Sequence, residues 1–393
     1  MKRPAFIGSG VLPGADEDAR LAHFLEHFWR QRALFLPDAL KGFDVPFDAD
    51  ELAGLACETN ADARIIRRTP DGYEQEQGPF DAARFDALGD RDWTLLVNGV
   101  DLDVPGFEPL LEQVRFLPDW RLDDVMVSFA APGGSVGPHY DRYDVFLLQA
   151  SGVRRWDLGG DGAFETAPLQ AVGGLSLLPD FTAARSITCE AGDGLYVPSH
   201  CAHHGIALSP CLTLSIGFRA PSLVQLVDDW IQRVLEGADD TPLDLDPALP
   251  VTRGHLDERT IEAAREVLRT RILSALEGEG FAEHLGGFLT LPPRGLAADV
   301  PEPLDERALL HQLERGALLE RAPGLRLVLR PIDNGTQVFA AGEILRHPAP
   351  IEELTSLTKL SSLGAHDLGT PPTLALATEL HNRGLLILTD GAP

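Results

Sequence analysis

The segment best suited to chemistry spans residues 133–141 and reads GGSVGPHYD. Within it, His139 and Asp141 stand two residues apart and precede a strand-like run. Alternate side chains of a β-strand point to one face, so an imidazole nitrogen and a carboxylate oxygen could share a metal ion. An H-x-D pair alone is more often a surface pair, and two ligands leave a divalent cation underbound. A third ligand is therefore expected from another strand.

The candidates for this third ligand lie in residues 192–205, which read GDGLYVPSHCAHHG. His203 follows the proline by five residues and the first glycine by eleven. This is the spacing of the second cupin motif, G-x5-P-x-G-x2-H, with His200 in place of the motif's glycine. A residue other than glycine at this position makes the predicted turn less certain, but it does not change which residue is expected to bind the metal. We expect His203 to bind the metal, and His200 and His204 remain alternatives.

Two imidazoles and one carboxylate form the facial triad of non-haem Fe(II) oxygenases. Such a triad leaves positions open for the 2-oxo acid group of 2-oxoglutarate and for O2. The absence of thiolate from the set disfavours a closed zinc site. The four cysteines show no C-x-x-C pair and are expected to be reduced thiols. The sequence therefore predicts Fe(II) as the metal and 2-oxoglutarate as the cosubstrate.

The far carboxylate of 2-oxoglutarate needs a cation, and arginine offers a two-pronged hydrogen-bond donor. Arg154 stands 15 residues after His139 in the strand-like run GVRRWDL, and Arg155 should face the other way. Ser128, in the preceding run MVSF, could add a hydroxyl. A surface cation and a core serine are the alternative readings of Arg154 and Ser128. Packing is favoured for two further polar residues of a later strand, Thr213 and Ser215.

Four regions are expected to position these residues. Residues 1–90 show helical spacing of apolar residues and are expected to be mainly helical, packing on a barrel. Residues 91–221 contain short β-rich runs separated by Gly and Pro, which indicate a β barrel. Residues 222–302 return to helical periodicity. Residues 303–393 combine helices with a hairpin over 325–331 and 336–345 and suggest a winged-helix-like α+β domain.

Charge and hydropathy exclude several classes of protein. Sixty acidic against 33 basic residues give a net charge of −27, which disfavours nucleic acid and anionic membranes as partners and would attract a basic protein. Solubility alone, or a salt-adapted host, would also explain the charge. No apolar run reaches the length of about 18 residues that a membrane helix needs, and the first residues lack a secretory signal. A cytoplasmic location is expected.

At these motifs the chain resembles the JmjC-type Fe(II)/2-oxoglutarate oxygenases of the cupin superfamily. It looks most like the bacterial ribosomal oxygenases that hydroxylate an arginine of the large-subunit (50S) ribosomal protein numbered sixteen. The matching stretches are PGGSVGPHYDRYDVFLLQASGVRRWDL, DGLYVPSHCAHHGIAL, SIGFRAP and, near the N-terminus, HFLEHFWRQRALFLPDAL. At the position after the distal ligand, relatives frequently have an acidic residue, whereas this chain has His204. This difference puts the details of substrate recognition in doubt.

The resemblance implies a fold, ligands and an activity. The fold would be a mainly β, double-stranded β-helix core with N-terminal helices, a helical dimerisation region and a C-terminal winged-helix domain. His139, Asp141 and His203 would bind Fe(II), and Arg154 and Ser128 would bind 2-oxoglutarate. The enzyme would be a homodimeric dioxygenase that couples oxidative decarboxylation of 2-oxoglutarate to hydroxylation of an arginine in a ribosomal protein.

Three other functions remain open from the sequence. One is a 2-oxoglutarate oxygenase acting on histidine, lysine or a small molecule. A second is a metal-binding cupin that is not an oxygenase and has no need of Arg154. The third is an interaction protein with a winged helix and an inactive barrel, which the intact triad disfavours.

Overall fold

The computed structural model describes residues 12–14, 16–160, 165–219, 221–236, 256, 258–292, 301–359 and 362–390. The chain divides into two compact units, residues 1–220 with 360–362 and residues 221–359 with 363–393. The first residues, where the sequence shows no secretory signal, lie outside the described part. Within the described part, no helix is both long and apolar enough to cross a bilayer.

The first three helices of the first unit begin at side-chain caps. Asp16 accepts a hydrogen bond from the Ala19 amide at the start of the first helix, and Asp48 forms a capping box with Glu51 at the second. The helices are α1 (Glu17–His27), α2 (Ala49–Leu55), α3 (Ala82–Asp86), α4 (Val100–Asp103) and α5 (Glu108–Leu111), followed by the 3-10 turns η1 (Glu112–Val114) and η2 (Asp119–Arg121).

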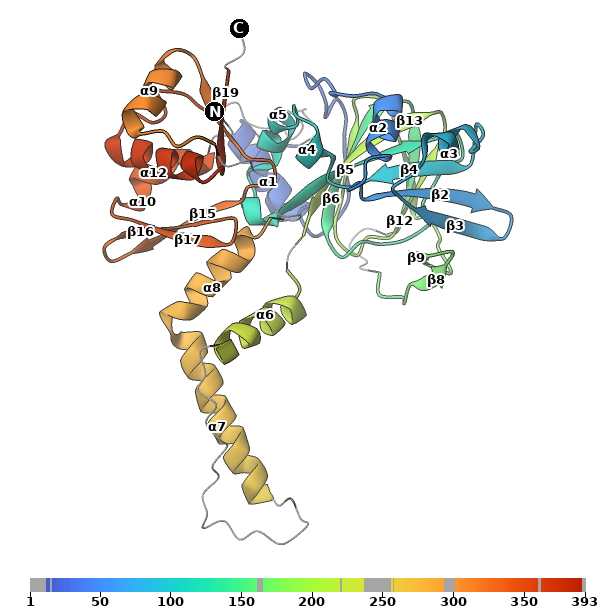
Figure 1. Cartoon of the computed structure of the whole chain (residues 1–393). Coiled ribbons are helices and arrows are strands. Elements are labelled where there is room, and N and C mark those ends of the chain that lie inside the picture. Colours follow the sequence, from blue (N-terminus) through green and yellow to red (C-terminus); the bar gives the residue numbers. More distant parts are fainter. Residues whose placement is uncertain are drawn as a thin grey trace. The chain divides into compact units, whose positions relative to one another are not determined.

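The strands of this unit form two main antiparallel sheets (Figure 1). The larger sheet has the order β1-β11-β6-β13-β5-β4-β2-β3, the smaller one the order β10-β7-β12, and β8 and β9 form a separate pair. Their bounds are β1 (Leu34–Leu36), β2 (Ala63–Thr69), β3 (Gly72–Gln77), β4 (Trp93–Val97), β5 (Leu122–Ala130), β6 (Asp144–Ser151), β7 (Arg154–Leu158), β8 (Gln170–Val172), β9 (Leu175–Leu177), β10 (Arg185–Cys189), β11 (Gly194–Val197), β12 (His203–Ala207) and β13 (Cys211–Phe218).

Strand β6 is buried on both faces because it separates two cores. Phe146 and Leu148 pack on the outer side with Phe24 of α1. Val145 and Leu147 pack on the inner side with Trp156 and other residues of the smaller sheet. Burial on both faces explains the nearly unbroken apolar run in the sequence of β6. The inner side is the interior of the double-stranded β-helix.

One expectation about the N-terminal region is wrong. Residues 63–77 form the hairpin β2–β3, which extends the larger sheet beyond β4. The first 90 residues are therefore mixed helix and strand, not mainly helical. Ile65 and Ile66 of β2 are both fully buried, so the strand carries little of the polar–apolar alternation by which a strand is recognised.

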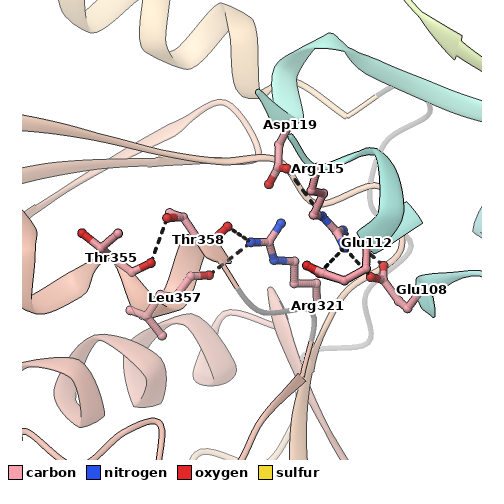
Figure 2. Close-up of polar contacts among 8 residues, drawn as sticks. All are labelled: Glu108, Glu112, Arg115, Asp119, Arg321, Thr355, Leu357 and Thr358. Atoms are coloured by element: carbon pink, nitrogen blue, oxygen red, sulfur yellow. Dashed lines mark hydrogen bonds and ion pairs between the residues drawn. The ribbon is translucent and has the colours of Figure 1, made fainter. Parts of the chain in front are cut away.

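The second unit consists of helices and two three-stranded sheets, β18-β14-β19 and β15-β16-β17. Arg321 of β14 donates to the carbonyls of Leu357 and Thr358, which fixes this strand to α11 (Figure 2). The helices are α6 (Leu223–Glu236), α7 (Glu258–Glu277), α8 (Glu279–Thr290), α9 (Glu306–Glu314), α10 (Ile351–Leu354), α11 (Ser356–Lys359) and α12 (Pro371–Asn382), and the strands are β14 (Leu318–Arg321), β15 (Leu327–Ile332), β16 (Gly335–Ala340), β17 (Glu343–His347), β18 (Ser362–Leu363) and β19 (Leu386–Thr389).

The C-terminal hairpin has one more strand than the sequence predicts. Residues 336–345 are not one strand, because Ala341 and Gly342 both adopt positive φ and turn the chain between β16 and β17. Helix α8 packs on the resulting sheet, where a Cβ at Gly286 would lie 2.4 Å from the Phe339 ring. This contact explains the glycine inside the helix.

Candidate metal centre and cosubstrate pocket

The three predicted metal ligands converge inside the first unit. Nε2 of His139 lies 3.9 Å and Nε2 of His203 lies 3.7 Å from the same oxygen, Oδ2 of Asp141. One ligand atom from each residue falls within 4.8 Å of the other two. Across the described ranges, no other group of three histidine, cysteine or acidic residues meets this criterion. Two nitrogens and one oxygen at this separation can bind a single divalent cation and leave its remaining positions open.

The backbone brings these ligands together differently from the expected strand. Residues 139–141 belong to no strand, and His139 instead forms an isolated antiparallel bridge with His203. The His139 amide donates to the His203 carbonyl at 3.0 Å, and the reverse bond is 2.8 Å long. The expectation that His139 and Asp141 alternate on a regular strand is therefore wrong, although both side chains join the three-residue group with His203. The two histidines meet because their backbones pair directly.

Each imidazole is oriented by a hydrogen bond of the same kind, from Nδ1 to the backbone carbonyl two residues earlier. Nδ1 of His139 donates to the Gly137 carbonyl and Nδ1 of His203 donates to the Cys201 carbonyl, each at 2.9 Å. This arrangement leaves the Nε2 lone pair of each ring free for a metal. Burial, and secondarily the neighbouring His139, lowers the pKa of His203, so the ring is in the neutral form that a metal requires.

The two alternative histidines point elsewhere. His200 has φ of 60°, the left-handed conformation that suits the glycine of the cupin motif. Its ring stacks on Tyr140 at 5.1 Å, and its Nδ1 lies 3.3 Å from the Glu165 carbonyl. His204 turns to the opposite face of β12, edge-on to Phe181, and burial lowers its pKa to about 4. Neither belongs to the group that the three ligands form.

Arg154 lies in the barrel interior, 3% exposed. Its Nη1 donates to Oγ of Ser128 and Oγ1 of Thr213, both at 3.2 Å. Within the described ranges no carboxylate forms an ion pair with Arg154, and its Nε has no hydrogen-bond partner. Burial lowers the pKa of the guanidinium. A buried cation with only neutral partners is suited to bind an anion.

Arg115, whose side chain is 11% exposed, shows how a structural arginine is paired with carboxylates. Arg115 lies 2.7 Å from Glu108, 3.5 Å from Asp119 and 3.7 Å from Glu112 (Figure 2). These carboxylates raise the pKa of Arg115 against the effect of burial. Arg154 differs from Arg115 in having no acidic partner among the described residues.

The sequence did not identify every polar residue around Arg154. Thr213, for which packing was favoured, is a hydrogen-bond partner of the arginine and also donates to Gln149 at 3.2 Å. Gln149 is 1% exposed and was not singled out. Its signal was present: it is the polar residue at the inward position two after Leu147 in an apolar run. Arg155 faces outward as expected and lies 3.2 Å from Asp157.

Comparison with known families places both units. The JmjC domain family matches residues 109–226, and the ROXA-like winged helix family matches residues 277–386. The Escherichia coli protein named ribosomal protein uL16 3-hydroxylase is 34% identical over 366 residues, covering 92% of this chain and 95% of that protein. A probable ribosomal oxygenase of Haemophilus influenzae is 29% identical over 383 residues, covering 93% and 92%.

Solved structures agree with these relatives. The E. coli ribosomal oxygenase YcfD in complex with cobalt and 2-oxoglutarate superposes with a TM-score of 0.78 at 32% identity, covering 94% of this chain and 98% of the other. Another X-ray structure of the E. coli protein gives a TM-score of 0.79, covering 93% and 97%. The β core with its C-terminal winged helix is the architecture that the resemblance implied. The chain belongs to the JmjC-type family of bacterial ribosomal oxygenases.

Proposed function

We propose that this protein is an Fe(II)- and 2-oxoglutarate-dependent dioxygenase that hydroxylates an arginine side chain of a large-subunit (50S) ribosomal protein. The observation that carries the proposal is the pairing of a three-ligand metal group with a buried arginine that has only neutral partners. The relatives named above support the substrate class, since one is called a hydroxylase of uL16.

The donor set fits ferrous iron. In the proposed enzyme, His139 and His203 bind the metal through Nε2 and Asp141 through its carboxylate, with no thiolate in the set. The bound iron, with 2-oxoglutarate and O2, supplies the oxidising power for hydroxylating an unactivated carbon. The carbonyls of Gly137 and Cys201 hold the two rings in place and fix their tautomers.

Arg154 and Ser128 would bind the distal carboxylate of 2-oxoglutarate. A carboxylate placed on the guanidinium would convert an uncompensated buried charge into an ion pair, and the Nε and Ser128 hydroxyl could both donate to it. The cosubstrate would then span the barrel from the anion end at Arg154 to the metal end at His203. Both ends lie on the inner face of the smaller sheet, where Arg154 and His203 are buried.

We infer that the protein acts as a homodimer through its helical region, residues 222–302. Helix α6 and the C-terminal half of α7 expose apolar side chains, which are 37–78% exposed: Leu223, Val224, Val227, Ile231, Leu235, Val267, Leu268, Ile272, Leu273 and Leu276. Large exposed apolar surfaces are characteristic of protein interfaces. We expect Leu268→Glu with Ile272→Glu to give monomers by light scattering, while Arg269→Glu leaves the dimer intact. Monomeric wild-type protein would contradict the inference.

We also propose that the protein is cytoplasmic, that its substrate is a basic ribosomal protein and that it binds no nucleic acid directly. The net charge of −27 would favour encounter with a basic protein and oppose binding to RNA.

We further propose that a barrel region over 91–221, onto which residues 1–90 pack, forms one functional part, with residues 303–393 as a winged-helix module for protein contacts. Truncation before Pro303 should leave the cosubstrate-binding barrel soluble, and loss of all soluble protein would contradict this boundary.

The deciding experiment compares ribosomal proteins before and after reaction. Ribosomal proteins from a strain lacking the enzyme are incubated with the purified protein, Fe(II), 2-oxoglutarate and O2, then mapped by mass spectrometry. We expect a one-oxygen mass increase on one arginine of uL16, which is absent with His139→Ala. An increase on histidine or lysine would reassign the substrate residue. Failure to bind 2-oxoglutarate would favour a metal-binding cupin that is not an oxygenase.

A further inference from the structure

Trp156 is a large buried side chain in the barrel that the proposed roles leave unused. It is 5% exposed and stands on β7 between Arg154 and Leu158, all three on the inner face. Its ring packs with the apolar side chains of the interior, including Val145 and Leu147. Its position in the strand places it between the two ends of the proposed cosubstrate pocket.

The register of the smaller sheet fixes this position. Leu158 pairs with His203 at the metal end, and Arg154 pairs with Ala207 at the anion end. The Trp156 ring centroid lies 6.0 Å from the His203 ring, and the Arg154 Cζ lies 5.0 Å from the Trp156 ring. Trp156 therefore contacts a proposed metal ligand on one side and the proposed carboxylate anchor on the other.

Gly205, directly opposite Trp156 on β12, explains how so large a ring fits there. A Cβ at Gly205 would lie 2.5, 2.7 and 2.9 Å from three carbons of the Trp156 ring, closer than packed carbons approach. Gly205 has no positive φ that would demand glycine, so the ring is the reason for it. Any side chain at Gly205 would move the ring away from β12.

We propose that Trp156, seated against Gly205, is the residue that sets the length of the cosubstrate. The ring would form the apolar wall beside the two methylenes that separate the 2-oxo acid end of 2-oxoglutarate from its distal carboxylate. Since the metal ligand and Arg154 fix the two ends, a chain with an extra methylene must bow sideways between them, and the Trp156 ring limits the space for that bow. This inference rests on the proposed 2-oxoglutarate dependence and identifies a specificity-determining residue for it.

Two substitutions should change the chain-length preference in opposite directions. Trp156→Phe removes one ring and enlarges the middle of the pocket, so it should favour the six-carbon diacid 2-oxoadipate. Gly205→Ala displaces the ring toward the bound chain, narrowing the pocket, and should favour 2-oxoglutarate still more strongly over 2-oxoadipate. One methylene in an apolar pocket changes affinity by about 10- to 200-fold, so we expect shifts of at least about tenfold in the affinity ratio against 2-oxoglutarate.

The test is calorimetric titration of the full-length protein loaded with Co(II), using 2-oxoglutarate and 2-oxoadipate as probes. Ile206→Val, on the outer face of β12, is the matched control and should keep the wild-type ratios. A second measurement is tryptophan fluorescence: added 2-oxoglutarate should change the emission of the wild type and of Trp230→Phe, but not of Trp156→Phe.

The outcomes separate this inference from the proposed function. If the cobalt-loaded wild type fails to bind 2-oxoglutarate, the proposed function fails. If the wild type binds it but Trp156→Phe and Gly205→Ala both keep the wild-type preference within about twofold, the length-setting role is wrong and the function stands. Should Trp156→Phe not fold, the ratio measured for Gly205→Ala decides the question, and an unchanged ratio overturns the inference.

Discussion

Replacing Arg154 by methionine should stabilise the protein and weaken its binding of cosubstrate at once. Methionine keeps most of the buried apolar stem and removes the charge. Arg154 is 3% exposed, and its described partners are the two neutral hydroxyls of Ser128 and Thr213. The substitution therefore separates a charge kept for binding from one kept for stability.

The expected changes in stability and affinity follow from the cost of burying the charge of Arg154 and from the interactions that offset this cost. Burying a charge without an opposite partner costs several kcal/mol, and two hydrogen bonds from a charged donor, both 3.2 Å long, offset part of this. We expect Arg154→Met to raise the free energy of unfolding by about 1–2 kcal/mol, or roughly 2–8 °C in Tm. Losing one member of a buried ion pair costs about 2–5 kcal/mol, so 2-oxoglutarate should bind about 30- to 5,000-fold more weakly.

The assay combines thermal unfolding without cosubstrate and calorimetric titration of 2-oxoglutarate into the Co(II)-loaded protein. Saturating 2-oxoglutarate should raise the Tm of the wild type but not of Arg154→Met, because only the wild type gains binding energy in the folded state. Arg155→Met, on the outer face and paired with Asp157, is the control and should change neither property by much. A lower Tm for Arg154→Met together with unchanged affinity would refute the reasoning.

Three further predictions concern the metal, pH and the backbone. His139→Ala should abolish tight Co(II) binding, measured by visible absorption, and leave the near-ultraviolet circular dichroism unchanged; retained Co(II) binding would remove His139 from the site. Burial, the largest cause, raises the pKa of Asp101 to about 7. The folded state therefore holds a proton that the unfolded state loses between about pH 4 and 7, and stability falls over this range. Asp101 keeps some solvent contact, which reduces the effect. We expect the free energy of unfolding of Asp101→Asn, measured in urea, to exceed that of the wild type by roughly 1–3 kcal/mol at pH 8 and to match it near pH 4. Equal pH profiles for the two proteins would contradict this. Gly152 has φ of 68°, and a Cβ there would lie 2.1 Å from the Pro210 carbonyl oxygen. Gly152→Ala should therefore lower the free energy of unfolding by more than about 2 kcal/mol in the same assay. A decrease below about 1 kcal/mol would show that the turn adapts to the side chain.

The sequence was most informative where function needs a short spacing or a strict alternation. Placement of Arg154 followed from alternation along β7, whose residues are buried and half-buried in turn, with Arg155 outward. The choice of His203 as the distal ligand, which is part of the proposal, followed from its distance from a proline within a single turn and strand. Both depend on local geometry, which the order of residues encodes directly.

What the sequence could not supply was pairing between distant segments. The bridge between His139 and His203 joins residues 64 apart, and no local pattern marks it. The β2–β3 hairpin was missed for a similar reason, since its place at the end of the larger sheet depends on β4. Thr213 and Gln149 gained their roles from the register between β13 and β6, which aligns them opposite each other. Such registers are set by the assembled sheet.

His200 shows how the two kinds of information meet at the site. Its replacement of the motif's glycine made the turn uncertain, yet the structure places it in the left-handed conformation, which costs a residue with a Cβ about 1–2 kcal/mol. The contacts around it offset this cost: its amide donates to the Asp141 carbonyl at 2.7 Å, and its ring stacks on Tyr140. A glycine could make the first contact but not the second. The strained residue thus links the turn before His203 to the segment that carries the other two proposed ligands, and this link fixes the separation on which a shared metal depends.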